Sequence, residues 1–247
     1  MRQICSAITL IVLSIWLTSC SSDAPQPYPA PQNGSATQPY PAPGAQPYPP
    51  PIAQPVPTSP ALDLQRRAEA AYNNRDFAQA VEDYSKLIEL LPKNPDAYYN
   101  RALAYDDLGD SDRAIADYSK AIELDSKNTR AWYNRGILYH EQGKLDQALT
   151  DYNKAAELAP NAAVIFNNRG LVYADKGNLD QALADYSKAI ELDANLAVAY
   201  FNRGSVYRIK GLKAQAIPDL ETFLRIQVND PIHSAQAEQW LRELKGN

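Results

Sequence analysis

Several residue columns recur at one constant interval, and this repeat period constrains the fold more than any other feature of the sequence. An asparagine-arginine pair followed by a small residue returns four times without an insertion, and aspartate, alanine and tyrosine columns keep the same interval. A fixed period of this length indicates stacked supersecondary units, each too small to bury its own apolar face. The columns are Asn100, Asn134, Asn168 and Asn202; Asp83, Asp117, Asp151, Asp185 and Asp219; Ala80, Ala114, Ala148, Ala182 and Ala216; and Tyr105, Tyr139, Tyr173 and Tyr207.

Each period has room for two helices of about 14 residues, with a glycine between them. A helix often ends at a residue with positive φ, which glycine adopts without strain. These glycines are Gly109, Gly143, Gly177 and Gly211.

The order of aromatic and small residues within one unit resembles the tetratricopeptide repeat (TPR). In the third unit this order runs from the segment Ala131–Gly136 through Tyr139 to Pro160, with Ala148, Tyr152 and Ala155 between them. The resemblance implies an all-α fold, a right-handed superhelical solenoid of five helix pairs with a concave groove. The five predicted units are residues 61–94, 95–128, 129–162, 163–196 and 197–230.

The two ends of the array depart from the repeat pattern. The first unit has Arg66-Arg67-Ala68 in place of the asparagine triplet, and Pro218 should distort or restart the second helix of the last unit. Residues 231–247 are predicted to form a capping helix with one apolar face. That face would consist of Ile232, Ala235, Trp240, Leu241 and Leu244.

Residues 1–19 have the pattern of a bacterial lipoprotein signal peptide. Arg2 precedes an apolar run from Ile4 to Leu17, which is shorter than the roughly 20 residues needed to span a bilayer. The segment Leu17–Cys20 resembles the lipobox, in which the cysteine is lipidated and becomes the first residue of the mature chain. The resemblance implies an extracytoplasmic protein, lipid-anchored at Cys20 to the cell membrane or the outer membrane. An uncleaved signal anchor and an ordinary secretory signal are the alternatives.

Residues 20–60 are predicted to be a disordered tether. Fourteen of the 19 prolines lie between Pro25 and Pro60, and Gln-Pro-Tyr-Pro occurs three times. Such a segment cannot bury enough apolar surface to fold, and it favours extended polyproline II structure. It is either a spacer or a docking motif for an aromatic groove.

Composition excludes several classes of function. The chain has 24 Lys and Arg against 29 Asp and Glu, a net charge of −5, so no basic surface for nucleic acid is expected. Cys5 and Cys20 are the two cysteines, and His140 and His233 are the two histidines. No phosphate-binding loop or catalytic triad motif is present. We therefore expect neither a catalytic site nor a metal or other cofactor.

The arginine of each triplet precedes an aspartate by the same offset in all four units. A constant offset across the two helices of a unit predicts structural ion pairs rather than an anion site. The predicted pairs are Arg101 with Asp117, Arg135 with Asp151, Arg169 with Asp185 and Arg203 with Asp219.

The resemblance to TPR proteins implies that the first helix of each unit lines the groove. The asparagine column is similar to a ladder that grips the backbone of an extended peptide, although the same residues could instead serve as framework between helices. The implied peptide-binding residues are Tyr99, Asn100, Leu103, Asp106, Tyr133, Asn134, Ile137, His140, Asn168, Leu171, Phe201 and Asn202.

Acidic residues near the middle of the groove favour a protein or peptide partner with lysine or arginine. The sequence thus predicts a non-enzymatic scaffold or adaptor, attached to the membrane through its lipid alone, in envelope assembly or secretion. One alternative is a self-associating module that forms homo-oligomers. The other is a metal-dependent enzyme that uses Asp106, Asp107, His140, Glu141 and Asp175.

Overall fold

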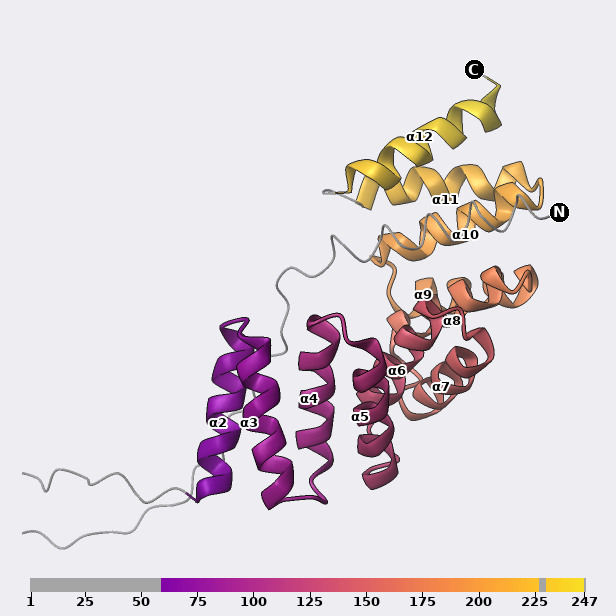
Figure 1. Ribbon diagram of the computed structural model, residues 1–247. Coiled ribbons are helices and arrows are strands. Elements are labelled where there is room, and N and C mark those ends of the chain that lie inside the picture. Colours follow the sequence, from indigo (N-terminus) through magenta and orange to yellow (C-terminus); the bar gives the residue numbers. More distant parts are fainter. Residues whose placement is uncertain (1–58, 227–229, 247) are drawn as a thin grey trace, which may run out of the picture.

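The structure is a computed structural model that describes residues 59–226 and 230–246, and every regular element within those ranges is an α-helix (Figure 1). The predicted signal peptide, Cys20 and nearly all of the tether lie outside the described residues. The helices are α2 (Pro60–Asn73), α3 (Phe77–Leu90), α4 (Pro95–Asp107), α5 (Ser111–Leu124), α6 (Thr129–Glu141), α7 (Leu145–Leu158), α8 (Ala163–Asp175), α9 (Leu179–Leu192), α10 (Ala197–Ile209), α11 (Lys213–Ile226) and α12 (Pro231–Lys245).

The helices form five pairs, α2–α3 to α10–α11, and successive pairs follow the repeat units of the sequence. Each pair packs against the next, and α12 packs on α11, so the chain builds a solenoid of helix pairs in sequence order (Figure 1). The first helix begins at Pro60, because the Ser59 side chain accepts a hydrogen bond from the Leu62 amide at 3.3 Å. The predicted tether therefore extends slightly too far, since Pro60 is already helical.

Close approach between the two helices of a unit explains the small residues of the first helix. A Cβ atom on Gly170 would lie 2.7 Å from the ring of Tyr186, a contact that real structures do not show. Gly136 and Gly204 face Tyr152 and Leu220 in the same way. The alanine column and the tyrosines of the second helices, Tyr84, Tyr118, Tyr152 and Tyr186, fill the core almost without solvent exposure.

The arginine column joins three helices at each step of the array. Each arginine makes two bonds to the aspartate of its own unit, with N–O distances of 2.6–2.9 Å. Its third nitrogen donates to an oxygen on the second helix of the preceding unit at 2.8–3.1 Å. The aspartates are those predicted from the constant offset, and the preceding-unit partners are Ser85, Ser119, Asn153 and Ser187.

The first unit contains this ion pair in spite of its different triplet. Arg67 donates to the buried Asp83 at 2.8 Å, across the same offset as in the other units. This pair was missed from the sequence because the prediction followed the asparagine-arginine motif rather than the offset alone.

The four predicted glycines all have positive φ, from 71° to 78°, at the turn between the two helices of their units. In the first unit Arg75 occupies this place with φ of 63°, in the left-handed region that is strained for a side chain with a Cβ atom. The first turn is thus locally less favourable than the other four.

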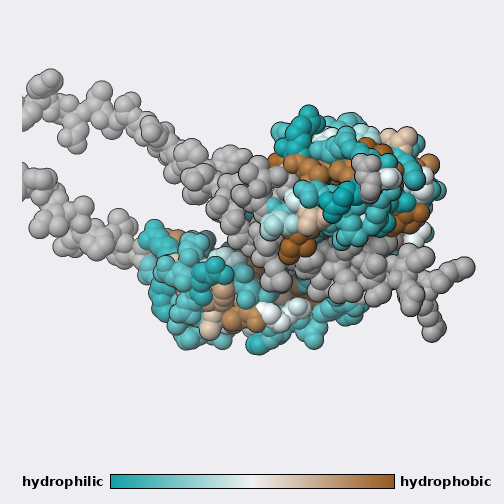
Figure 2. Space-filling model, turned by 90° about the horizontal axis from the view of Figure 1, so that it is seen from above, coloured by the Kyte–Doolittle hydropathy of each residue, from teal (hydrophilic) through white to brown (hydrophobic). Residues whose placement is uncertain are grey.

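The C-terminal helix covers the last unit, but its buried face differs from the predicted one. Ile232 is 61% exposed and Ala235 is also exposed, whereas His233 is buried beside Ala237, Trp240 and Leu241. The second helix of this unit also continues through Pro218 without a restart, and this proline is exposed. Seen from above, the described surface is mainly hydrophilic with smaller hydrophobic patches (Figure 2).

None of the helices in the described ranges is long and apolar enough to cross a bilayer. The membrane attachment predicted from the sequence depends on residues outside those ranges.

Replacing Arg75 with glycine should stabilise the protein, because glycine adopts the left-handed backbone of this turn without strain. We expect Arg75→Gly to raise the free energy of unfolding by about 0.5–1 kcal/mol in urea denaturation followed by circular dichroism. The matched variant Gly109→Ala should lower it by about 1 kcal/mol. Apart from its chain neighbours, no atom lies within 4 Å of a Cβ at Gly109. The loss of stability in this variant would therefore come from backbone strain and not from a steric clash. A loss of stability in Arg75→Gly would contradict the interpretation.

Breaking one buried ion pair should cost far more than removing an exposed one. The side chains of Arg135 and Asp151 are 14% and 2% exposed, so Asp151→Ala leaves a largely buried cation and should cost about 3 kcal/mol. The double variant Arg135→Met, Asp151→Leu should recover most of this loss. Glu157→Ala, which removes an exposed pair, should change stability by less than about 0.5 kcal/mol in the same urea titration. Equal losses for the two alanine variants would argue against a structural role for the column.

Candidate functional site

The first helices of neighbouring units contact each other directly, α6 with α8 and α8 with α10. Their side chains meet from one unit to the next, as in the hydrogen bonds from Asn134 to Tyr99 and from Asn168 to Tyr133. We call the surface formed by α2, α4, α6, α8 and α10 the inner face. It contains most of the residues expected to bind a peptide.

The asparagine column is bonded within the protein. Asn134 donates to the hydroxyl of Tyr99 at 3.2 Å, and Asn168 donates to that of Tyr133 at 2.9 Å. Asn202 donates to the side-chain oxygen of Asn167 at 3.1 Å, and Asn100 is hydrogen-bonded to Tyr84. These hydrogen bonds occupy side-chain amide nitrogens that would be needed to bind a peptide backbone. The structure therefore favours the interpretation that the asparagines connect helices within the array.

Some of the residues expected to contact a peptide are core residues, and the expectation was wrong for Phe201. Phe201 is 1% exposed and stacks on Trp240 with ring centroids 5.2 Å apart. α12 packs on α11 and α10 as the first helix of a further unit would, and Tyr99 and Asn167, at the equivalent places of the second and fourth units, are likewise buried. Asn202, Tyr99, Ile137 and Leu171 are also buried. The residues that keep partial exposure on the inner face are Asn100, Leu103, Asp106, Tyr133, Asn134, His140 and Asn168.

A group of carboxylates lies on the inner face of the second to fourth units. Burial, followed by the negative charges of Glu141 and Asp107, raises the pKa of Asp106 to about 6. Burial also raises the pKa of Glu141, and nearby His140 opposes that change. No hydrogen bond or ion pair within the described ranges holds the Asp106 carboxylate, whereas Asp107 accepts a bond from the Tyr72 hydroxyl at 2.5 Å. Asp106 is therefore a partly buried anion without a compensating cation.

His140 and Asp175 form a contact between α6 and α8. The Nε2 atom of His140 lies 2.6 Å from Asp175 Oδ2, while Asp175 Oδ1 is buried and has no hydrogen-bond partner. Both side chains are about nine-tenths buried. The sequence places these residues in one acidic group by their spacing, but their pairing was not predicted from it.

The five residues of the hypothetical metal site do not assemble into one. No group of three or more His, Cys, Asp or Glu side chains in the described part of the chain has the geometry of a metal centre. The pairings of Asp107 with Tyr72 and of Asp175 with His140 show where two of these carboxylates are engaged.

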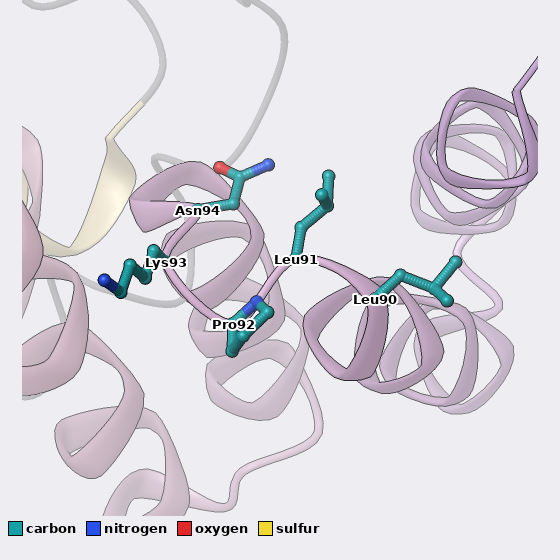
Figure 3. A pocket seen from close by; sticks show the side chains of 5 residues that line it. All are labelled: Leu90, Leu91, Pro92, Lys93 and Asn94. Atoms are coloured by element: carbon teal, nitrogen blue, oxygen red, sulfur yellow. The ribbon is translucent and has the colours of Figure 1, made fainter.

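A surface pocket of about 410 Å³ lies away from this face, at the loop between α3 and α4. Its side chains come from one short segment and point in different directions (Figure 3). Asn94 in this segment caps α4, since its side-chain oxygen accepts from the Asp96 amide at 3.0 Å. The lining residues are Leu90, Leu91, Pro92, Lys93 and Asn94.

Family models match much of the array. The model described as "Tetratricopeptide repeat" matches residues 129–162, a second one with that description matches 197–229, and "TPR repeat" matches 72–109, 104–143 and 170–211. "Tetratricopeptide repeat protein 36" of Caenorhabditis elegans is 42% identical over 45 residues. That match spans 18% of this chain and a quarter of the relative.

Solved structures with the same fold cover about 70% of this chain. YrrB, described as a TPR protein with an unusual peptide-binding site, is 24% identical with a TM-score of 0.63, over 72% of this chain and 92% of its own. MamA from Desulfovibrio magneticus RS-1 is 18% identical with a TM-score of 0.61, over 75% and 97%. PilF from Pseudomonas aeruginosa is 18% identical with a TM-score of 0.63, over 75% and 88%.

The likeness to these structures concerns the fold, and the family assignment comes from the repeat models. Together the models match residues 72–162 and 170–229, which is more than half of the chain. The helix pairs, the tight turns and the small-residue contacts within each unit agree with that match. The chain therefore belongs to the tetratricopeptide repeat family.

Proposed function

We propose that this protein is a membrane-anchored, extracytoplasmic scaffold whose inner face binds an extended segment of another polypeptide that carries a lysine or arginine. The observation that carries the proposal is the Asp106 carboxylate. It is partly buried, its pKa is raised by burial and by Glu141 and Asp107, and no cation in the described ranges pairs with it. A basic side chain of a ligand would supply the missing charge.

The family and the fold support a binding role over a catalytic one. YrrB, which has the same fold, is described as having a peptide-binding site. On the inner face of the present chain, Leu103 and Tyr133 offer partly exposed apolar surface beside Asp106 and His140. Among the described residues, the Asn134 side-chain oxygen accepts no hydrogen bond and remains an acceptor for a backbone amide, whereas that of Asn168 already accepts from Asn167.

The proposed anchor is the lipid on Cys20, followed by the Pro/Tyr-rich tether. About forty residues in polyproline II conformation would reach roughly 120 Å, so the array could meet partners well away from the bilayer. Such an adaptor suits envelope assembly or secretion, where a soluble domain must stay at the membrane while it holds another protein.

Binding of a basic peptide should strengthen as the pH rises through about 6, because a cation prefers ionised Asp106. The measurement is fluorescence anisotropy with a labelled nonapeptide of alanine and glycine that carries three lysines, between pH 5 and 8. Asp106→Asn should weaken binding about fivefold at pH 7.5, equivalent to ~1 kcal/mol, and should flatten the pH profile. Glu123→Gln, on the exposed side of α5, is the matched control and should bind like the wild type.

Two outcomes of this titration would refute the proposal. The first is equal affinity for the lysine peptide and for a peptide with three glutamates in their place. The second is a pH profile that Asp106→Asn leaves unchanged.

Replacing Cys20 should release the protein from the membrane, because its thiol is the proposed site of lipid attachment. In cells grown with labelled palmitate, we expect the wild type to carry the label and to sediment with membranes. Cys20→Ser should lose the label and the membrane association. The matched variant Cys5→Ser should keep both, and labelling of Cys20→Ser would exclude this residue as the attachment site.

A further inference from the structure

Arg208 differs from the other partly buried arginines of the array. Arg101, Arg135, Arg169 and Arg203 each pair with an aspartate, as described above. Within the described ranges Arg208 has no hydrogen bond and no ion pair, and its Nε atom is buried without a partner. Burial lowers its pKa, and the charge of Glu243, which opposes this effect, forms no ion pair with it. The guanidinium is thus a partly desolvated cation that pairs with no carboxylate of the described residues.

An aromatic side chain holds this guanidinium in place. The Cζ atom of Arg208 lies 4.3 Å from the ring centroid of Trp240, which is itself 4% exposed and stacked on Phe201. A guanidinium against a ring face keeps its N–H bonds directed outward in its own plane. The terminal nitrogens are not among the buried unpartnered atoms, so they reach the surface with donors free.

The repeat period places Arg208 on the inner face. It follows His140 by two repeat periods and Asp106 by three. These residues occupy equivalent places on the first helices of the fifth, third and second units. The inner face therefore has uncompensated negative charge near Asp106 and Glu141, and an unpaired positive charge at its C-terminal end.

We propose that the Arg208 guanidinium, held against Trp240, binds a carboxylate of the polypeptide segment on the inner face. Two parallel N–H bonds to the two carboxylate oxygens are the arrangement that a guanidinium favours. The carboxylate is the C-terminus of the segment or an aspartate or glutamate side chain. This inference rests on the proposed function, and it adds a direction: the basic residue of the ligand lies toward α4 and its carboxylate toward α10.

The test is an NMR titration of the full chain with sodium acetate as the carboxylate probe, against sodium chloride at equal ionic strength. We expect the side-chain Nε–H signal of Arg208 to shift and saturate with acetate, while that of the ion-paired Arg203 stays in place. Glu243→Gln should lower the half-saturating concentration at least twofold, because it removes a competing negative charge. An equal shift in chloride, or no saturation in acetate, would overturn the proposal.

A lysine variant distinguishes the contribution of the planar guanidinium from that of its positive charge. In Arg208→Lys, which keeps one positive charge, the response of the Trp240 indole N–H signal to acetate should fall at least fivefold. An unchanged response would show that the guanidinium does not bind the probe. The acetate response of wild type alone decides the question if this variant proves unfolded by circular dichroism.

Tripeptide probes distinguish the two sources of the carboxylate. Acetyl-trialanine with a free C-terminus and acetyl-Ala-Glu-Ala-amide each present one carboxylate, and acetyl-trialanine-amide presents none. A saturating Arg208 shift with either of the first two, but not with the third, supports the proposal and identifies the source. Equal responses to all three would overturn it. Asp106→Asn should leave the acetate response unchanged, so failure of this inference and failure of the proposed function give different results.

Discussion

The hydrogen bonds of the arginine column fix the relation between successive units. Each arginine donates hydrogen bonds to the aspartate of its own helix pair and to an oxygen of the preceding pair. Its planar guanidinium therefore connects three helices. A rotation of one unit against the next would break the bonds of a largely buried cation, which is costly. Such pairs contribute little net stability compared with apolar residues, but they specify one stacking register over others.

One consequence is that the inner face has its own internal contacts. With the register fixed, a side chain on one first helix meets a residue just over one repeat period later on the next, which joins Tyr133 to Asn168 and His140 to Asp175. Polar groups that could have faced a ligand are thereby satisfied within the protein. The groups left over are those whose charge has no counterpart, above all Asp106 and Arg208.

The sequence predicts the fold well because the repeat period converts one local pattern into the whole array. Arg135 and Asp151 lie on the two helices of a single pair. Their contact is therefore determined by the packing of those two helices, which the repeat pattern predicts. The contacts between first helices depend on the angle between units, which no single unit encodes. Phe201 illustrates the same limit: the composition of its own helix matches the groove-lining pattern, yet α12, which lies beyond the last repeat, buries it. Arg67 was missed for a simpler reason, since its motif differs while its offset does not.

The unpaired charges of the described inner face also bear on its proposed binding role. The folded-state pKa of Asp106 lies near 6, above its ordinary value of 3.8, so ionisation of this group destabilises the unliganded fold as the pH rises through that range. A group that costs stability in the free protein, and whose charge a ligand cation would compensate, contributes more to affinity than one already satisfied. The same argument applies to Arg208 with the charges reversed. Its partly desolvated guanidinium gains more binding free energy from a carboxylate than a hydrated lysine would. Since the two groups lie three units apart, a ligand that satisfies both must be extended and must bind in one direction.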